Sequence, residues 1–417
     1  MKTINKLFLL SLITFILACD SDDDPIDPVN QRLTEGFIVT GTSEDGTTVF
    51  AQYFEELPSG AIDLTQGQAF QFFSPADVYD GAVYTSRTDG SNGLAKMVVD
   101  GNGEIIEEGF IATTESTSLI RVRDSNTGMY VDPNTPSQIK VFDPQTLQET
   151  GNVDLSAAPV FSDPLAEVRT SSAVFRGDNI FVVNREPVGG APLDNFTMVR
   201  GSLSSGTFGN QLNSTTGPTS GFNPIFRLTD EQGNLYVHHQ GDLSPFGNPG
   251  GILKIPAGSN EFDPNYDFRV VLDPTLFLQV MRGFVYYQNG IAYAQIAFET
   301  PARVVDIITN VGGIRNLTDD QIDEILFLLD NEENAGWVEV DLNAQQIIRK
   351  VPGIPQLSTF AVTNVQFIDN VPHFVIKNST VNAFYRYDPT MDQSEVVFSA
   401  TGASLNSVID LSANNLR

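Results

Sequence analysis

The stretch Ser137–Leu155, SQIKVFDPQTLQETGNVDL, determines how the rest of the chain is interpreted. Ile139 and Val141 alternate with polar residues, which is the two-residue period of a β-strand with one buried face. Asp143-Pro144-Gln145-Thr146 then has the composition of a turn, because proline presets φ at the second turn position and aspartate can accept hydrogen bonds from the backbone ahead of it. A second strand follows towards Val153. The stretch therefore predicts a β-hairpin.

Similar hairpins recur along the 417-residue chain, near Val49–Leu64, Leu94–Phe110, Gln138–Leu155, Phe196–Leu212, Ile252–Val271, Trp337–Val351 and Phe384–Phe398. Their spacing, mostly about 40–60 residues, is typical of propeller blades. In the second unit the expected strands are Phe70–Val78, Gly81–Arg87, Leu94–Val99 and Glu104–Ile111. The repeat predicts an all-β protein, a seven-bladed β-propeller, with six or eight blades as alternatives.

The two ends of the repeat region complement each other. The first unit, which begins near Glu35, lacks an innermost strand of its own, and Ser404–Leu411 (SLNSVIDL) is a spare strand with no hairpin after it. Pairing of the C-terminal strand with the N-terminal blade would close the ring and remove exposed strand edges. We therefore expect the propeller to span residues 35–417.

One segment, Glu299–Glu333, interrupts the pattern between the second and third strands of the sixth blade. Thr318 and Gln321 have the spacing of a capping box, so the segment is expected to contain a helix. Its apolar residues at helical spacing are Ile322, Ile325, Leu326 and Leu329. Two interpretations remain open: the helical insertion packs on its own blade, or it is a lid or a docking element.

The N-terminus has the features of an exported bacterial lipoprotein. Residues 1–18 combine Lys2 and Lys6 with an apolar run that is short for a membrane span, as in a signal peptide. Ile16-Leu17-Ala18-Cys19 resembles a lipobox, and Cys19 is the only cysteine, so lipidation is expected there; a plain secretory signal is the alternative. Residues 19–34 form an acidic tether. Its Asp20–Asp24 run resembles the tag that directs Bacteroidota lipoproteins to the cell surface, although acidic residues also make ordinary solvated linkers.

The charge of the chain excludes one class of partner. With 23 Lys and Arg against 52 Asp and Glu, the formal net charge is −29. Such a field repels nucleic acid and anionic lipid, so no nucleic-acid binding is expected.

Cationic residues recur at one blade position. The segments Gly81–Arg87, Asn179–Arg185 and Val371–Lys377 superpose without gaps. Arg87, Arg185 and Lys377 are thus expected at the end of the second strand, on the face where a central tunnel opens. His238, His239 and Gln240 stand at this place in the fifth blade. The set predicts a site for a small anionic ligand; alternatively, each cation pairs with a nearby acid and orders a loop.

Signals for catalysis or a resident metal are weak. The chain has three histidines, and the adjacent His238 and His239 should point to opposite faces of a strand, so they are not expected to share a metal. His373 lies between apolar residues, as a core histidine does. We assign no catalytic residue, metal or cofactor, although a calcium ion held by tunnel carboxylates, as in lactonase propellers, remains an alternative.

The blade style, together with the lipobox, resembles a family of Bacteroidota surface lipoproteins that carry a domain of unknown function. The residues that carry the resemblance are Glu35-Gly36-Phe37-Ile38-Val39-Thr40, Asp100-Gly101-Asn102-Gly103-Glu104-Ile105 and Lys140-Val141-Phe142-Asp143-Pro144. Members look like propellers encoded beside TonB-dependent receptors, and some bind ferric siderophores and pass them to the receptor. The resemblance implies a non-enzymatic siderophore-binding lipoprotein, anchored by lipid in the outer membrane at the cell surface. A docking protein without a small ligand and a calcium-dependent lactonase or lyase are the alternatives.

Overall fold

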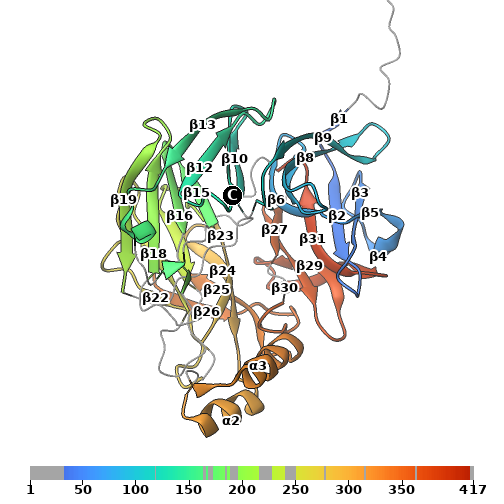
Figure 1. Ribbon diagram of the computed structural model, residues 1–417. Helices are drawn as coiled ribbons and strands as arrows, with labels where there is room; N and C mark the ends of the chain where they lie inside the picture. The colour runs from blue at the N-terminus through green and yellow to red at the C-terminus, as the bar shows by residue number, and fades with distance from the viewer. Residues whose placement is uncertain are drawn as a thin grey trace, which may run out of the picture.

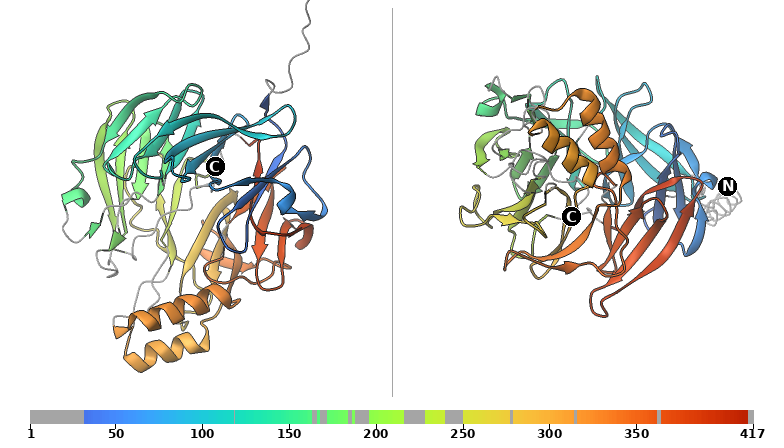
Figure 2. Two further views of the ribbon diagram at one scale, coloured as in Figure 1. Left: turned by 45° about the vertical axis from the view of Figure 1, so that its right-hand side comes forward. Right: turned by 90° about the horizontal axis from the view of Figure 1, so that it is seen from below.

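The computed structural model describes residues 32–117, 119–162, 166–167, 172–183, 186–187, 196–215, 228–239, 250–276, 279–313, 316–361 and 364–413. The predicted signal peptide, Cys19 and the acidic run therefore lie outside the described residues. Within the described part, most residues with regular structure are in strands, arranged in antiparallel sheets that follow one another around the molecule (Figures 1 and 2). The arrangement is all-β and propeller-like.

The strands group by hydrogen bonding as follows. One sheet comprises β2 (Phe37–Thr42), β3 (Val49–Phe54), β5 (Gln68–Phe70) and the last strand, β31 (Ser404–Asp410). The next comprises β6 (Ser74–Tyr79), β7 (Ala82–Arg87), β8 (Gly93–Asp100) and β9 (Ile105–Ala112), with β1 (Arg32–Leu33) beside β8. Then come β10 (Ile120–Asp124), β11 (Thr127–Val131), β12 (Gln138–Phe142) and β13 (Glu149–Asp154). These join, through one parallel contact of β13 with β19, the strands β15 (Ser172–Arg176), β16 (Asn179–Val183), β18 (Phe196–Ser202) and β19 (Thr207–Ser214).

The second half of the chain continues the pattern. Its sheets are β20 (Leu235–His239), β21 (Gly251–Ile255) and β22 (Phe268–Arg269), and β23 (Met281–Gln288), β24 (Ile291–Ala297), β25 (Ala335–Asp341) and β26 (Gln346–Lys350). The last comprises β27 (Val365–Ile368), β28 (Val371–Lys377), β29 (Asn382–Asp388) and β30 (Gln393–Thr401), with β4 (Gly60–Asp63) parallel to β30. Smaller elements are β14 (Ala166–Glu167), which pairs with β17 (Glu186–Pro187), and the 3₁₀ turns Leu64–Gln66 and Pro159–Ser162.

The hairpin predicted over Ser137–Leu155 is present. β12 pairs antiparallel with β13, and the Asp143 carboxylate accepts hydrogen bonds from the amides of Gln145 and Thr146, at 2.7 and 3.1 Å. Asp143 thus holds the turn as its side-chain chemistry predicts.

The prediction of a hairpin over Val49–Leu64 is wrong. β3 pairs with β5, and β4 pairs with β30 of the last sheet instead. Phe70 belongs to β5, so it is not part of the first strand of the second unit, where the sequence put it. Ile62 of β4 packs there against the apolar cluster that contains Phe398. The physical reason is that this pairing covers the outer edge of β30, which would otherwise present unpaired backbone groups.

The first and last strands of the repeat region pair, as their sequences predict. β31 runs antiparallel to β2 from Phe37 opposite Asp410 to Thr42 opposite Ser404, with one register shift after Thr40. The Thr40 and Ser407 hydroxyls lie 2.7 Å apart in the buried part of this pairing.

The first strands of the sheets lie towards the middle of the molecule and strands such as β19 and β5 lie at its periphery (Figure 1). Arg121 of β10 joins two neighbours there: its guanidinium donates to the carbonyls of Ala76 in β6, at 2.9 Å, and Ala173 in β15, at 3.1 Å. The Asp77 carboxylate accepts from the amide of Val122 at 2.7 Å. Apolar clusters fill the spaces between adjacent sheets.

The insertion between β24 and β25 contains two helices, α2 (Ala302–Val311) and α3 (Asp319–Asn331), rather than one. The predicted capping box is present, since Thr318 caps α3 and Gln321 bonds back to it. Both helices pack on their own sheet through a cluster that includes Val280 and Ala297, at one end of the sheets (Figure 2). No helix of the described residues is long and apolar enough to cross a membrane.

The apolar side of α3 is only partly buried. Ile325 and Leu329 pack inward, whereas the predicted partners Ile322 and Leu326 remain 39% and 42% exposed. The expected single face is therefore split, because α2 covers only one side of α3.

Candidate functional site

The described members of the predicted cationic set stand at strand ends, where the sequence alignment put them. Arg87 is the last residue of β7 and Lys377 the last residue of β28. Arg185 and Gln240 lie outside the described residues. The structure therefore places two of the three predicted cations.

Arg87 is held by two carboxylates. Its Nε and Nη2 donate to Asp89 at 2.9 and 3.0 Å, and its Nη1 donates to Glu107 at 2.6 Å. The guanidinium also stacks on Phe72 and Phe110, with its central carbon 4.9 and 5.1 Å from the ring centres. Because two acids already match its charge, Arg87 fits the loop-ordering interpretation better than that of a ligand-seeking cation.

Lys377 is exposed at the helix end of its sheet. Just beyond it, the amide and hydroxyl of Ser379 donate to the carboxylate of Glu333, in the segment that leads out of α3. Lys377 is thus next to the insertion and available to a ligand or partner that approaches that end.

His238 and His239 are buried at the end of β20, with 3% and 0% of their surfaces exposed. Burial lowers the pKa of both imidazoles to about 3, and the nearby charge of Arg282 on His238, and of Arg269 on His239, acts in the same direction. Both rings are therefore neutral near pH 7 and cannot attract an anion by charge. Within the described residues, Nδ1 of each ring is buried without a hydrogen-bond partner.

Sequence reasoning missed Arg282, a partly buried cation near the start of β23. A register shift between Met281 and Gly283 takes Arg282 out of regular pairing with β24, and bulges of this kind redirect side chains. Its guanidinium carbon lies 4.9 Å from the centre of the Phe360 ring. Burial lowers the pKa of Arg282, and its Nε is buried without a hydrogen-bond partner.

The environment of Arg282 differs from that of Arg87. Among the described residues, no carboxylate contacts Arg282, although desolvated charges in proteins are usually paired. Two further N–H donors in this part of the molecule, Nδ2 of Asn334 and Nε1 of Trp337, are also buried and unpartnered within the described residues. The signal in the sequence was Arg282 itself, the one charged residue in the run VMRGFVYY.

Support for a metal site is confined to a carboxylate-lined cavity. Glu299, Glu332 and Glu333 line a space of about 390 Å³ with Asn331 and Ser379, next to the end of α3. Across the described part of the chain, however, no three His, Cys, Asp or Glu side chains are grouped closely enough to hold a metal ion.

Comparisons with known proteins give similar strand arrangements only. No family model matches the chain, and no curated protein matches its sequence. Among solved structures, a quinonprotein alcohol dehydrogenase-like protein from Bacteroides thetaiotaomicron is 11% identical with a TM-score of 0.48, covering 92% of this chain and 79% of its own. The WD40 β-propeller domain of Doa1 is 10% identical with a TM-score of 0.41, covering 82% and 86%. AztD from Citrobacter koseri is 11% identical with a TM-score of 0.42, covering 90% and 98%. Likeness at this level carries no conclusion about activity.

Proposed function

We propose that the sheets form a closed ring of seven blades, in which β31 supplies the innermost strand of the blade that begins with β2. The pairing of β31 with β2 supports this closure. In such a ring, the insertion between β24 and β25 stands at the end where strand ends such as Lys377 also lie.

We propose that the protein is a lipid-anchored outer-membrane protein, displayed at the cell surface through Cys19 and its acidic tether. It binds a small anionic ligand of the ferric siderophore class without altering it, and delivers the complex to a TonB-dependent transporter. The siderophore and the transporter are proposed from the family resemblance, and the location is proposed from the lipobox.

The observation that supports the ligand class is that Arg282 has no carboxylate partner among the described residues and that its Nε is buried there without a hydrogen-bond partner. A ferric catecholate complex is anionic and aromatic, so it can satisfy the guanidinium electrostatically and stack beside Phe360. In a chain of net charge −29, a desolvated cation that has no carboxylate partner within the described part of the chain is unusual and favours an anion at this place. Lys377, exposed at the same end, adds a second positive charge.

Arg282→Gln is expected to weaken binding of a ferric catecholate by at least tenfold, about 1.4 kcal/mol, because the buried positive charge is lost. Isothermal titration of the detergent-purified protein with ferric and iron-free siderophores measures this. Arg303→Gln is the matched control, since Arg303 is an exposed arginine paired with Glu324 on the helices.

Binding that is equal in the two variants, or absent with every ferric chelate, would refute the proposed ligand site. Mass spectrometry of the recovered ligand tests the non-enzymatic part of the proposal, which requires the ligand to return unchanged.

A docking function is the second candidate, and the exposed side of α3 favours it. Phe327 is 65% exposed, and Ile322 and Leu326 of the same helix are 39% and 42% exposed. Phe327→Asp is expected to leave the thermal unfolding midpoint unchanged, because the side chain packs little, and to abolish co-purification with the transporter from native membranes. Met391→Asp is the control, since Met391 is 60% exposed in the turn between β29 and β30, away from α3. If both variants retain the transporter, α3 is not the docking surface.

A further inference from the structure

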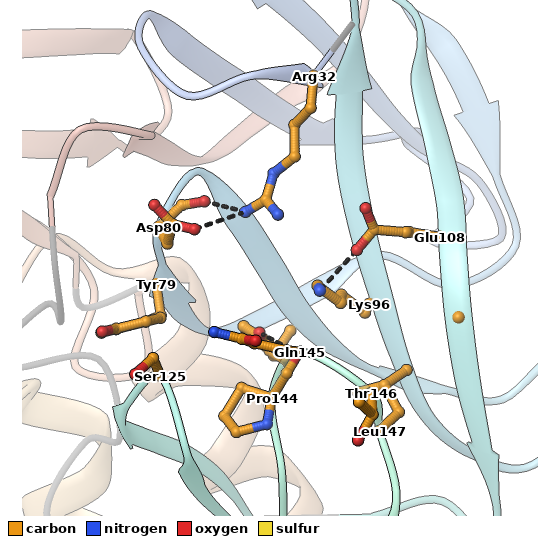
Figure 3. A pocket seen from close by; sticks show the side chains of 12 residues that line it. Arg32, Tyr79, Asp80, Lys96, Glu108, Ser125, Pro144, Gln145, Thr146 and Leu147 are labelled. Carbon is orange, nitrogen blue, oxygen red and sulfur yellow. Dashed lines mark hydrogen bonds and ion pairs between the residues drawn. The ribbon is translucent and has the colours of Figure 1, made fainter. Parts of the chain in front are cut away.

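A second cavity lies at the other end of β7 from Arg87, between the β6–β9 and β10–β13 sheets (Figure 3). It has a volume of about 370 Å³, within the range of roughly 300–1,000 Å³ that small-molecule sites occupy. Its walls come from β1, the β6–β7 turn, strands β8 and β9, and the turn between β12 and β13.

Two ion pairs form part of the wall. Lys96 is only 5% exposed, and its Nζ lies 2.6 Å from a carboxylate oxygen of Glu108. Arg32 donates to the backbone carbonyl of Asp80 and lies 3.9 Å from its carboxylate. The Nε of Arg32 is buried and has no hydrogen-bond partner within the described residues. The cations are more buried than their partners, so the carboxylates are the more accessible members.

The charges of this wall balance. Two cations face two carboxylates, so an added anion or cation would leave a charge uncompensated when water is expelled from the cavity. A neutral ligand with hydroxyl groups keeps both ion pairs intact, because a hydroxyl can donate to a carboxylate and accept from a cation.

The remaining wall is suited to a ring with both polar and apolar faces. The Gln145 amide extends into the space between Tyr79 and Lys96 (Figure 3). Pro144 and Leu147 contribute apolar surface. The Tyr84 hydroxyl donates to the Pro144 carbonyl at 3.1 Å and so fixes the position of this turn against β7.

We propose that this cavity is a binding site for a neutral polyhydroxylated ring, that is, one or two units of an uncharged sugar. Asp80 and Glu108 accept hydrogen bonds from its hydroxyls, Lys96 and Arg32 hold those carboxylates in place, and Gln145 supplies a further donor and acceptor. The site does not depend on the ligand of Arg282.

Saturation-transfer difference NMR on the detergent-purified full chain tests this with glucose, galactose, mannose, N-acetylglucosamine and maltose. Glucuronate, an anion, and methylamine, a cation at neutral pH, are the charged comparison ligands. We expect at least one neutral sugar to bind with a Kd of about 1 mM or tighter, which is the range for a ligand of this size. We expect Asp80→Asn and Gln145→Ala to weaken binding at least fivefold each.

The matched control is Asp369→Asn. Asp80 and Asp369 occupy equivalent hairpin turns with left-handed backbone, φ 49° and 51°, and asparagine tolerates this conformation. Asp369 does not line the cavity. The proposal is overturned if no neutral sugar binds, if a charged comparison ligand binds more tightly than every sugar, or if Asp369→Asn weakens sugar binding as much as Asp80→Asn does.

Discussion

A chain that ends at Gly402 is expected not to fold into the native structure. It lacks β31, whose removal leaves both the backbone groups of β2 and the surrounding apolar core without partners. Leu405, Val408, Ile409 and Leu411 are each at most 1% exposed. Full burial of each contributes about 1.5–3 kcal/mol, so about 6–12 kcal/mol is lost, comparable with the whole unfolding free energy of about 5–15 kcal/mol of an ordinary domain.

The matched control ends at Ala413 and keeps every described contact of β31, so its thermal unfolding midpoint should equal that of the full chain. Circular dichroism and light scattering distinguish a native from an aggregated chain. A synthetic peptide with the sequence of residues 403–413 should restore cooperative unfolding to the shortened chain, because strand addition to an open edge provides the missing hydrogen bonds. Cooperative unfolding of the shortened chain alone, at the midpoint of the control, would show that β31 is dispensable.

This pairing could be predicted from the sequence because it depends on local signals at both ends of the chain. A first unit without an innermost strand and a last strand without a hairpin complement each other whatever lies between them. The hairpin of β12 and β13 and the capping box of Thr318 were predictable for the same reason: period, turn residues and caps involve residues close together in sequence.

The contacts of long side chains were not predictable in this way. Alignment correctly placed Arg87 at a strand end, and Asp89 is close to it in sequence. The second carboxylate that matches its charge, Glu107, comes from β9, two strands away in the sheet. The surroundings of Arg282 come from Phe360, in the connection between β26 and β27, from His238 in β20, and from a bulge that the sequence does not mark.

The same limit applies to surfaces and cavities. Helical spacing put Ile322 with Ile325, yet the position of α2 determines which of them is buried. The cavity lined by Arg32 and Lys96 joins segments from two sheets, whereas the sequence around Pro144 and Gln145 predicts only a turn.

Acidification from pH 7 to pH 5 is expected to lower the unfolding free energy by several kcal/mol through the three histidines. Burial lowers the pKa of His238 and His239 to about 3 and that of His373 to about 4, whereas an unfolded imidazole titrates near 6.5. Above pH 6.5 the rings are neutral in both states and the fold keeps its full stability. Below it, the unfolded state takes up protons that the folded state excludes, down to the folded pKa values near 3 and 4.

The slope is about 1.4 kcal/mol per pH unit for each histidine. At pH 5 this is about 2 kcal/mol each, or about 6 kcal/mol for the three together. The carboxylates whose pKa values are lowered, such as Asp63 and Asp388, contribute mainly at lower pH, since their unfolded values lie near 3.8. The interval from pH 7 to pH 5 therefore isolates the imidazoles.

Urea unfolding at pH 7 and at pH 5 measures the effect. His373→Gln should reduce the pH-dependent difference by about one third, and His238→Gln with His239→Gln by about two thirds, whatever each substitution does to stability at pH 7. Comparison of differences rather than absolute values removes the packing cost, which for His373 includes its stacking on Phe384, with ring centres 5.3 Å apart. Nitrogen-15 NMR of the rings provides an independent test. Imidazoles that titrate near pH 6.5 in the folded protein would contradict the argument, because buried neutral rings must stay unprotonated at pH 5.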